Sequence, residues 1–115
     1  VNAQDHERMR SIYAFVDEHF HRHIALDEVA SHINMTVPAF CRYFKKLTNK
    51  TFTQFVNEYR IAHACRMLSD EHLSISAVSY ESGFNNLSHF NKLFRLITGA
   101  SPREYRRSLR RVVRA

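Results

Sequence analysis

Apolar side chains recur along this chain at intervals of three and four residues, which is the spacing of amphipathic helices. In the first such stretch, Ile12, Val16 and Phe20 would lie on one face of a helix. The chain has only two glycines and two prolines, which also favours helices over a turn-rich β fold. The predicted helices cover residues 7–22, 26–33, 37–48, 52–69, 75–82 and 87–98, and a seventh begins at about residue 102.

The residues between these stretches have the chemistry of helix ends. Three of them carry a side-chain oxygen that can cap the helix that follows, namely Thr36, Ser74 and Asn86. Two pairs have the spacing of a capping box, namely Thr51 with Gln54 and Ser101 with Glu104. Four residues tolerate the left-handed backbone conformation that ends a helix, namely Asn34, Asn49, Gly83 and Gly99.

The helix predicted for residues 52–69 carries apolar residues on more than one face, which indicates packing partners on two sides. At a rise of 1.5 Å per residue this helix would be roughly 27 Å long. We therefore predict one all-α domain of about seven helices over residues 1–115. In it a bridging helix (51–70) joins a first helix-turn-helix subdomain (7–50) to a second one (71–111).

An internal repeat supports the two subdomains. A shift of 50 residues places Phe40 on Phe90 and Phe44 on Phe94. In the preceding helix the matching shift is 49, so the second turn contains one extra residue, Asn85. Each copy then consists of a short helix, a tight turn and a longer basic helix, which is the helix-turn-helix pattern.

Positive charge is concentrated in two segments. Residues 37–50 hold four Lys or Arg and no acid, and residues 86–115 hold eight Lys or Arg and one acid. The rest of the chain holds five basic and ten acidic residues, within a net charge of +6. Two basic segments on an otherwise acidic body are typical of a protein that binds a polyanion.

The second helix of such a motif enters the DNA major groove, and its outer face and first turns read base edges. A bridging helix of the predicted length could hold two such helices in adjacent major grooves, which lie about 34 Å apart. The candidates for base contacts are Pro38, Cys41, Arg42, Leu87, Ser88, His89, Asn91 and Lys92. The candidates for phosphate contacts are Lys45, Lys46, Thr51, Arg95, Arg103, Arg106 and Arg107.

A series of short motifs runs through both copies of the repeat. In the second copy they are Gly83-Phe84, Ser88-His89-Phe90, Lys92, Phe94-Arg95, Thr98-Gly99, Ser101-Pro102 and Tyr105-Arg106. Upstream they are Leu26-Asp27-Glu28-Val29-Ala30, Phe44-Lys45-Lys46 and Asn57-Glu58-Tyr59-Arg60-Ile61. Together they resemble the DNA-binding domain of AraC/XylS-type transcription regulators, over about residues 8–107.

The sequence departs from this family pattern in three places. Ala25 stands where the family often has a Ser or Thr cap, which would weaken the helix start by roughly 1 kcal/mol. Asn49 stands where glycine is usual, and Asn can adopt the same backbone angles. Pro38 and Cys41 replace longer polar readers, which places most of the specificity of the first helix on Arg42.

The resemblance implies a seven-helix, two-lobed domain that binds specific double-stranded DNA and regulates transcription, with activation as the expected direction. It implies RNA polymerase as a second partner, a separate sensing or dimerisation domain outside this chain, and a monomeric state for the isolated domain. No cofactor, metal or membrane is expected. The two cysteines form no CxxC motif or disulfide framework, which fits a reducing cytoplasm. The resemblance implies a bacterial protein associated with the nucleoid.

Other functions receive weaker support from the residues. His19 and His23 would share a helix face, but no nearby residue completes a tetrahedral metal site. Cys41 beside Arg42 would suit a redox-sensing thiol, although a small outward-facing residue is the simpler interpretation. No phosphate-binding loop or catalytic triad is recognisable, so we do not expect an enzyme. A non-specific architectural nucleic-acid-binding module is the main alternative.

Overall fold

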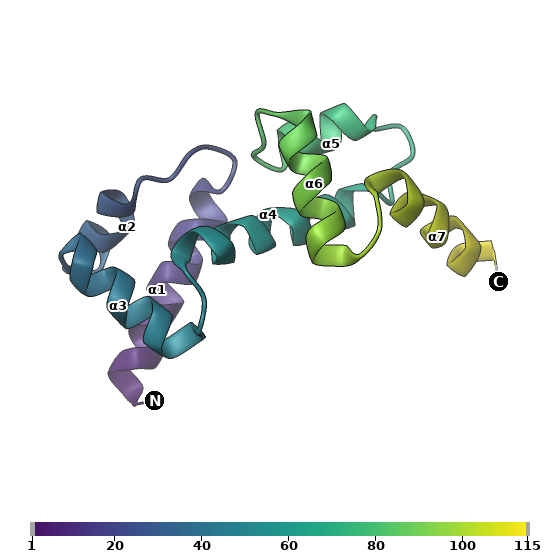
Figure 1. Ribbon diagram of the computed structural model, residues 1–115. Coiled ribbons are helices and arrows are strands. Elements are labelled where there is room, and N and C mark those ends of the chain that lie inside the picture. The colour runs from purple at the N-terminus through teal and green to yellow at the C-terminus, as the bar shows by residue number, and fades with distance from the viewer. Residues whose placement is uncertain (1, 115) are drawn as a thin grey trace. The chain divides into compact units, whose positions relative to one another are not determined.

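The computed structural model describes residues 2–114, and within that range it contains seven α-helices and no strand (Figure 1). This confirms the predicted all-α fold. The helices are α1 (Ala3–His19), α2 (Leu26–His32), α3 (Val37–Thr48), α4 (Phe52–Met67), α5 (Ile75–Glu81), α6 (Leu87–Thr98) and α7 (Pro102–Arg114).

The predicted bounds are correct for α3 and α6 and least accurate for α1. That helix begins at Ala3 instead of near residue 7, because Asn2 caps it in a full capping box. The Asn2 side chain accepts a hydrogen bond from the Asp5 backbone N–H, and the Asp5 carboxylate accepts one from the Asn2 backbone N–H. The first turn is polar, so apolar spacing could not detect it. The helix ends at His19, three residues before the predicted end.

The chain divides into two compact units, unit 1 (residues 1–56) and unit 2 (residues 57–115). The division falls inside α4, which contributes to both. Its first residues, including Phe52 and Val56, are buried in unit 1. This agrees with the prediction that its apolar residues would face more than one side.

The core of unit 1 is built from aromatic rings. Phe40 and Phe44 of α3 are fully buried. Both rings lie edge-on to the ring of Phe52, with centroids 5.3 and 5.6 Å away. Phe55 adds a second contact to Phe44 at 5.4 Å, and Tyr13 of α1 contacts Phe55 at 5.2 Å. These rings fix the inner face of α3, so its other face is directed to solvent.

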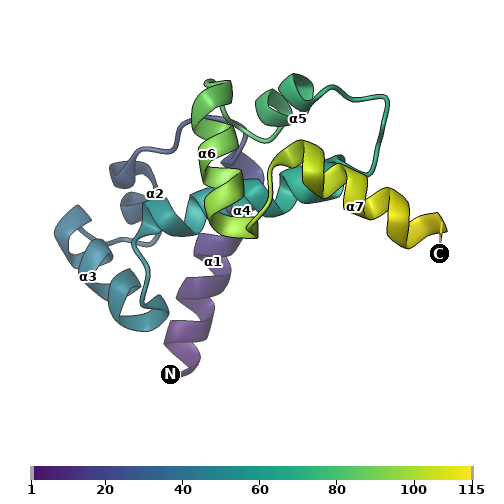
Figure 2. The same ribbon diagram turned by 45° about the vertical axis from the view of Figure 1, so that its right-hand side comes forward.

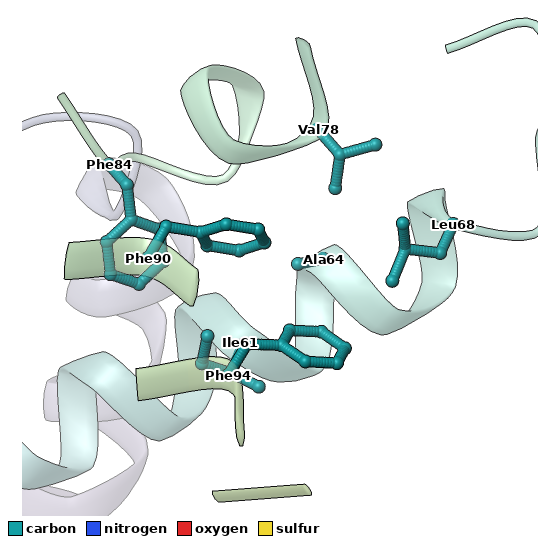
Figure 3. Close-up of a cluster of buried hydrophobic side chains, with 7 residues drawn as sticks. All are labelled: Ile61, Ala64, Leu68, Val78, Phe84, Phe90 and Phe94. Carbon is teal, nitrogen blue, oxygen red and sulfur yellow. The ribbon is translucent and has the colours of Figure 1, made fainter. Parts of the chain in front are cut away.

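The core of unit 2 repeats this arrangement around α6, which lies against α5 and α7 (Figure 2). Phe90 and Phe94 are fully buried, with ring centroids 5.6 Å apart. Phe84 and Tyr105 extend the ring cluster on either side, at 5.2 and 5.6 Å. Figure 3 shows the buried cluster, whose members are Ile61, Ala64, Leu68, Val78, Phe84, Phe90 and Phe94.

The helix-turn-helix turns of the two units share one backbone geometry. Asn34 has φ 60° and Gly83 has φ 96°, so both turns pass through the left-handed region. The Met35 N–H donates to the Ala30 carbonyl at 2.9 Å, and the Phe84 N–H donates to the Ser79 carbonyl at 3.1 Å. The repeat seen in the sequence is therefore also a repeat in hydrogen bonding. Asn85 is the extra residue, inserted before the cap of α6.

The ends of α3 and α6 are also alike. Thr48 and Thr98 each donate a side-chain hydrogen bond back to the carbonyl four residues earlier, both at 2.8 Å. Each is followed by a residue with positive φ, Asn49 at 60° and Gly99 at 84°. Asn49 therefore adopts the conformation predicted for it where the related family usually has glycine.

Candidate nucleic-acid interface

The exposed face of α3 carries the residues that the sequence singles out in unit 1. Pro38, Cys41 and Arg42 are all exposed, whereas Phe40 and Phe44 point into the core. The helix starts at the Thr36 cap, whose hydroxyl accepts a hydrogen bond from the Ala39 N–H at 3.3 Å. Proline is favourable in this first turn, because the turn's N–H groups lack helical partners in any case.

Tyr43 connects α3 to the first turn of α1. Its hydroxyl donates a hydrogen bond to the Asp5 carboxylate at 2.7 Å, and the Arg8 guanidinium lies 5.2 Å from its ring centroid. The hydrogen bond from Tyr43 lowers the pKa of Asp5 below its ordinary value, with help from the Asn2 backbone N–H. Burial raises the pKa of Tyr43. No local sequence pattern predicts this contact, because its partners are 38 residues apart.

The exposed face of α6 carries the matching residues of unit 2. They are Leu87, which is 44% exposed, and the exposed residues Ser88, His89, Asn91 and Lys92. The Asn86 side chain caps the helix by accepting a hydrogen bond from the His89 N–H at 2.9 Å. The His89 ring lies edge-on to Phe84, 6.1 Å between centroids. The candidate readers of each unit therefore lie together on one helix, opposite its buried phenylalanines.

Most of the phosphate candidates are exposed cations, but they differ in their partners. Lys45 donates to the Asn49 carbonyl at 3.4 Å, at the end of α3. Its counterpart Arg95 instead bonds to the Glu104 carboxylate at 3.1 Å. The pKa of Glu104 is lowered, first by the hydrogen bond from the Ser101 backbone N–H. Arg95 is therefore partly neutralised within unit 2, whereas in unit 1 the position equivalent to Glu104 is the neutral residue Gln54.

The hydroxyl and the backbone N–H of Thr51 both take part in a capping box. Its hydroxyl accepts from the Gln54 N–H at 3.1 Å, and its own N–H donates to the Gln54 side chain at 2.9 Å. It is exposed at the start of α4, as are Lys46 in α3 and Arg103 and Arg107 in α7.

Arg106, for which the sequence predicts a phosphate contact, is bound to the loop between α4 and α5. Its guanidinium donates to three backbone carbonyls, those of Leu68 at 3.0 Å, Asp70 at 3.2 Å and Leu73 at 2.7 Å. The side chain is half-buried and holds the loop between α4 and α5. We therefore leave Arg106 out of the phosphate set. In the sequence Arg106 resembles its basic neighbours, because no local pattern indicates that three distant carbonyls converge on it.

Burial changes the acid-base properties of two groups in α4. It raises the pKa of the Cys65 thiol, which is half-buried beside Tyr105, whereas Cys41 is exposed on α3. It also lowers the pKa of Arg60, whose guanidinium lies 6.0 Å from the Phe84 ring centroid. Within residues 2–114 no three His, Cys, Asp or Glu side chains are placed to hold a metal ion. In the same range no helix is both long and apolar enough to cross a membrane.

Comparison with known proteins agrees with this geometry. A family model described as a helix-turn-helix domain matches residues 29–108. A transcriptional regulator from Chromobacterium violaceum, named for its AraC-type DNA-binding domain, has the same fold at a TM-score of 0.83 and 21% identity, over 91% of this chain and 94% of that one. This chain belongs to the AraC/XylS type of DNA-binding domains. As an AraC-type domain it is not an enzyme.

Other AraC-type relatives place this domain within longer proteins. The HTH-type transcriptional regulator YdeC from Bacillus subtilis is 30% identical over 87% of this chain, which spans 34% of that relative. The transcriptional activator RhaS from Klebsiella pneumoniae is 28% identical over 86% of this chain and 36% of its own length. The DNA-binding domain of AdpA, solved in complex with a target DNA, is 28% identical at a TM-score of 0.79, over 86% of this chain and 89% of that one. The chain therefore spans about a third of the curated relatives it matches.

Proposed function

We propose that this AraC-type domain recognises a specific duplex sequence through both α3 and α6 and activates transcription from it. The repeat carries the proposal. Two helix-turn-helix units with the same turn geometry each expose one basic reader at equivalent positions, Arg42 in α3 and Lys92 in α6. The AdpA domain, a structural relative at 28% identity, is described with a target DNA, which supports duplex DNA as the ligand.

In this proposal α4 is the bridge between a first helix-turn-helix subdomain (7–50) and a second (71–111). Its 16 residues correspond to a length of about 24 Å. That length is compatible with two recognition helices in successive major grooves, which lie about 34 Å apart. The domain would then read an asymmetric site of about two helical turns as a monomer.

The residues divide into base contacts and backbone contacts. Arg42 and Lys92 bind guanine, because Arg or Lys to the guanine O6 and N7 atoms is the commonest specific contact in the major groove. Asn91 suits adenine and Leu87 a thymine methyl group. The base-contact set is Pro38, Cys41, Arg42, Leu87, Ser88, His89, Asn91 and Lys92, and the backbone set is Lys45, Lys46, Thr51, Arg95, Arg103 and Arg107.

The proposal also covers the partners of the domain, the whole protein and its place in the cell. The name of the relative RhaS as a transcriptional activator supports activation and contact with RNA polymerase. The longer relatives support a separate sensing or dimerisation domain in the whole protein. We place the protein at the bacterial chromosome in the cytoplasm.

Selection of bound duplexes from a random pool tests specificity, and single substitutions then assign the contacts. Arg42→Ala and Lys92→Ala should each relax selection at one base position and weaken binding to the selected site by about 1–3 kcal/mol. Lys46→Ala, a phosphate contact in this proposal, is the matched control and should weaken binding equally to all sequences. Equal losses for all three variants, without a selected site, would favour the non-specific architectural module.

The two cysteines provide an internal test of contact by unit 1. Exposed Cys41 should react quickly with iodoacetamide, and half-buried Cys65 slowly, because burial raises the pKa of its thiol. The selected duplex should protect Cys41 and leave the rate at Cys65 unchanged. Unchanged labelling of Cys41 in the presence of saturating duplex would mean that α3 does not enter the groove.

A further inference from the structure

Unit 2 contains a hollow of about 350 Å³ that none of the proposed base contacts lines. Four arginines of α7 surround it, and Ile75, the first residue of α5, forms an apolar wall. The arginines are Arg103, Arg106, Arg107 and Arg110. Their spacing of three and four residues places all four on one face of α7. Four cations around one hollow repel one another unless anions lie near them, and an anionic ligand would relieve that repulsion.

The four guanidinium groups are not equivalent. Arg106 is held by the carbonyls of Leu68, Asp70 and Leu73, and Arg110 pairs with the Glu71 carboxylate. Arg103 and Arg107 make no hydrogen bond or ion pair with the side chains described up to residue 112, although the charge of Arg107 also acts on the Glu104 carboxylate. The hollow therefore has a fixed side, built by Arg106, and two exposed guanidinium groups available to a ligand.

The chemistry of the lining selects for a phosphate group. A guanidinium is a planar fork of donors that binds two oxygens of one phosphate at once. A phosphate has oxygens directed to several sides, so two arginines can bind it together. Ile75 and the aliphatic stems of the arginines offer an apolar surface for a sugar or another organic group attached to it. The volume lies in the range of small-molecule sites.

We propose that this arginine hollow binds a phosphate group, with Arg103 and Arg107 as its direct ligands and Arg106 as the residue that fixes its shape. Two sources share this chemistry. One is a backbone phosphate of the duplex bound by α6, in which case the inference rests on the proposed function. The other is a free phosphorylated small molecule, which would make the hollow a separate ligand site.

Titration of the whole chain with inorganic diphosphate at constant ionic strength, followed by backbone amide NMR, tests the site without DNA. Shifts should saturate and centre on residues of the hollow. Arg103→Gln and Arg107→Gln should each weaken binding about tenfold, as expected for loss of a charged hydrogen bond. Arg111→Gln removes the same charge from an exposed position of α7 that does not line the hollow, and should change little.

The outcomes distinguish a defined phosphate site from general attraction of the anion to exposed positive charge. Titration that does not saturate, or equal weakening by Arg111→Gln and Arg107→Gln, overturns the proposal. Because this arm contains no duplex, it can succeed even if the proposed DNA binding fails. Arg106→Gln is not used in it, because loss of the three carbonyl contacts would disturb the loop before α5.

A second arm identifies the source of the phosphate. If it is the duplex backbone, diphosphate should displace the selected duplex, and Arg107→Gln should reduce the salt dependence of DNA binding by about one phosphate, or roughly 0.9 in the logarithmic slope. Arg111→Gln should leave that slope nearly unchanged. If diphosphate binds with no effect on duplex affinity, and Arg107→Gln behaves like Arg111→Gln toward DNA, the ligand is a free phosphorylated molecule.

Discussion

Units 1 and 2 share a packing scheme and differ in what they expose. In each unit, two phenylalanines four residues apart fix one face of the second helix, Phe40 and Phe44 in α3 and Phe90 and Phe94 in α6. The exposed faces share the basic pair Arg42 and Lys92 but differ around it, with Pro38 and Cys41 in unit 1 where unit 2 has Ser88 and Asn91. Buried positions must conserve volume, whereas exposed positions are free to change with little effect on stability. The same fold can therefore present two different reading surfaces.

The units also differ in how they hold the second helix in place. Tyr43 of α3 reaches out to the polar first turn of α1, whereas Leu93, its counterpart in α6, packs on the apolar core of unit 2. Unit 1 therefore uses a polar contact that depends on ionisation, where unit 2 uses burial. The following substitutions test how far the two units are equivalent.

The largest effects should come from the shared phenylalanines. Phe44→Ala and Phe94→Ala should each lower the free energy of unfolding by about 3–5 kcal/mol, because each removes a fully buried ring that contacts other aromatic rings. Urea unfolding followed by circular dichroism measures this. Leu96→Ala in α6 is the control, since Leu96 is 77% exposed and should change stability by less than about 0.5 kcal/mol. A small loss in only one phenylalanine variant would show that the two cores are not equivalent.

The helix caps should have the next largest effect, with opposite signs in the two units. Ser74 accepts a hydrogen bond from the Ala77 N–H at 3.0 Å, so Ser74→Ala should cost about 1 kcal/mol. Its counterpart Ala25 has no side-chain cap, and only Glu28 bonds back to the Ala25 N–H, at 2.8 Å. Ala25→Ser should therefore stabilise unit 1 by up to about 1 kcal/mol. Thermal unfolding of both variants checks the pair, and destabilisation by Ala25→Ser would contradict it.

The residues after α3 and α6 should give smaller effects. A side chain added at Gly99 would meet no atom within 4 Å, so only the positive φ of 84° opposes it. Gly99→Ala should cost about 0.5–1 kcal/mol, since backbone strain is offset in part by the lower entropy of the unfolded chain. Gly99→Asn should cost less, about a few tenths of a kcal/mol, because Asn49 adopts the same conformation in unit 1. Differential scanning calorimetry can rank the stabilities of the two variants. An equal loss of stability in both would argue that backbone conformation is not the cause.

The polar contact of unit 1 should have the smallest effect, and its loss as the pH falls should be measurable in the acid titration of Asp5. The Tyr43 hydrogen bond lowers the pKa of Asp5, so its stabilisation is present above the ordinary pKa of an aspartate, about 3.9, and is lost as pH falls through the lowered value. Tyr43→Phe should move the pKa of Asp5 upward, toward that ordinary value. Carboxyl NMR titration measures the shift, and Leu93→Val in unit 2 is the control that should leave Asp5 unchanged.

Sequence patterns predicted the bounds of α3 and α6 to the residue, because the residues that begin and end a helix and the apolar spacing between them are all clear there. Each helix follows a capping side chain, carries phenylalanines at helical spacing and ends at a residue that adopts positive φ. The start of α1 was mispredicted, since its first turn has a cap but few apolar residues. The candidate readers followed directly from the helical period, because residues opposite a buried phenylalanine must be exposed.

The sequence by itself determined the helices, the repeat and the two exposed faces, because each depends on residues within one or two helical turns of one another. Only the tertiary structure decided which partners the long polar side chains have. It assigned Arg106 to three carbonyls more than 30 residues away, paired Tyr43 with Asp5, and gathered four arginines around Ile75. A long side chain can reach several partners, and packing of distant segments decides which one lies within hydrogen-bonding distance.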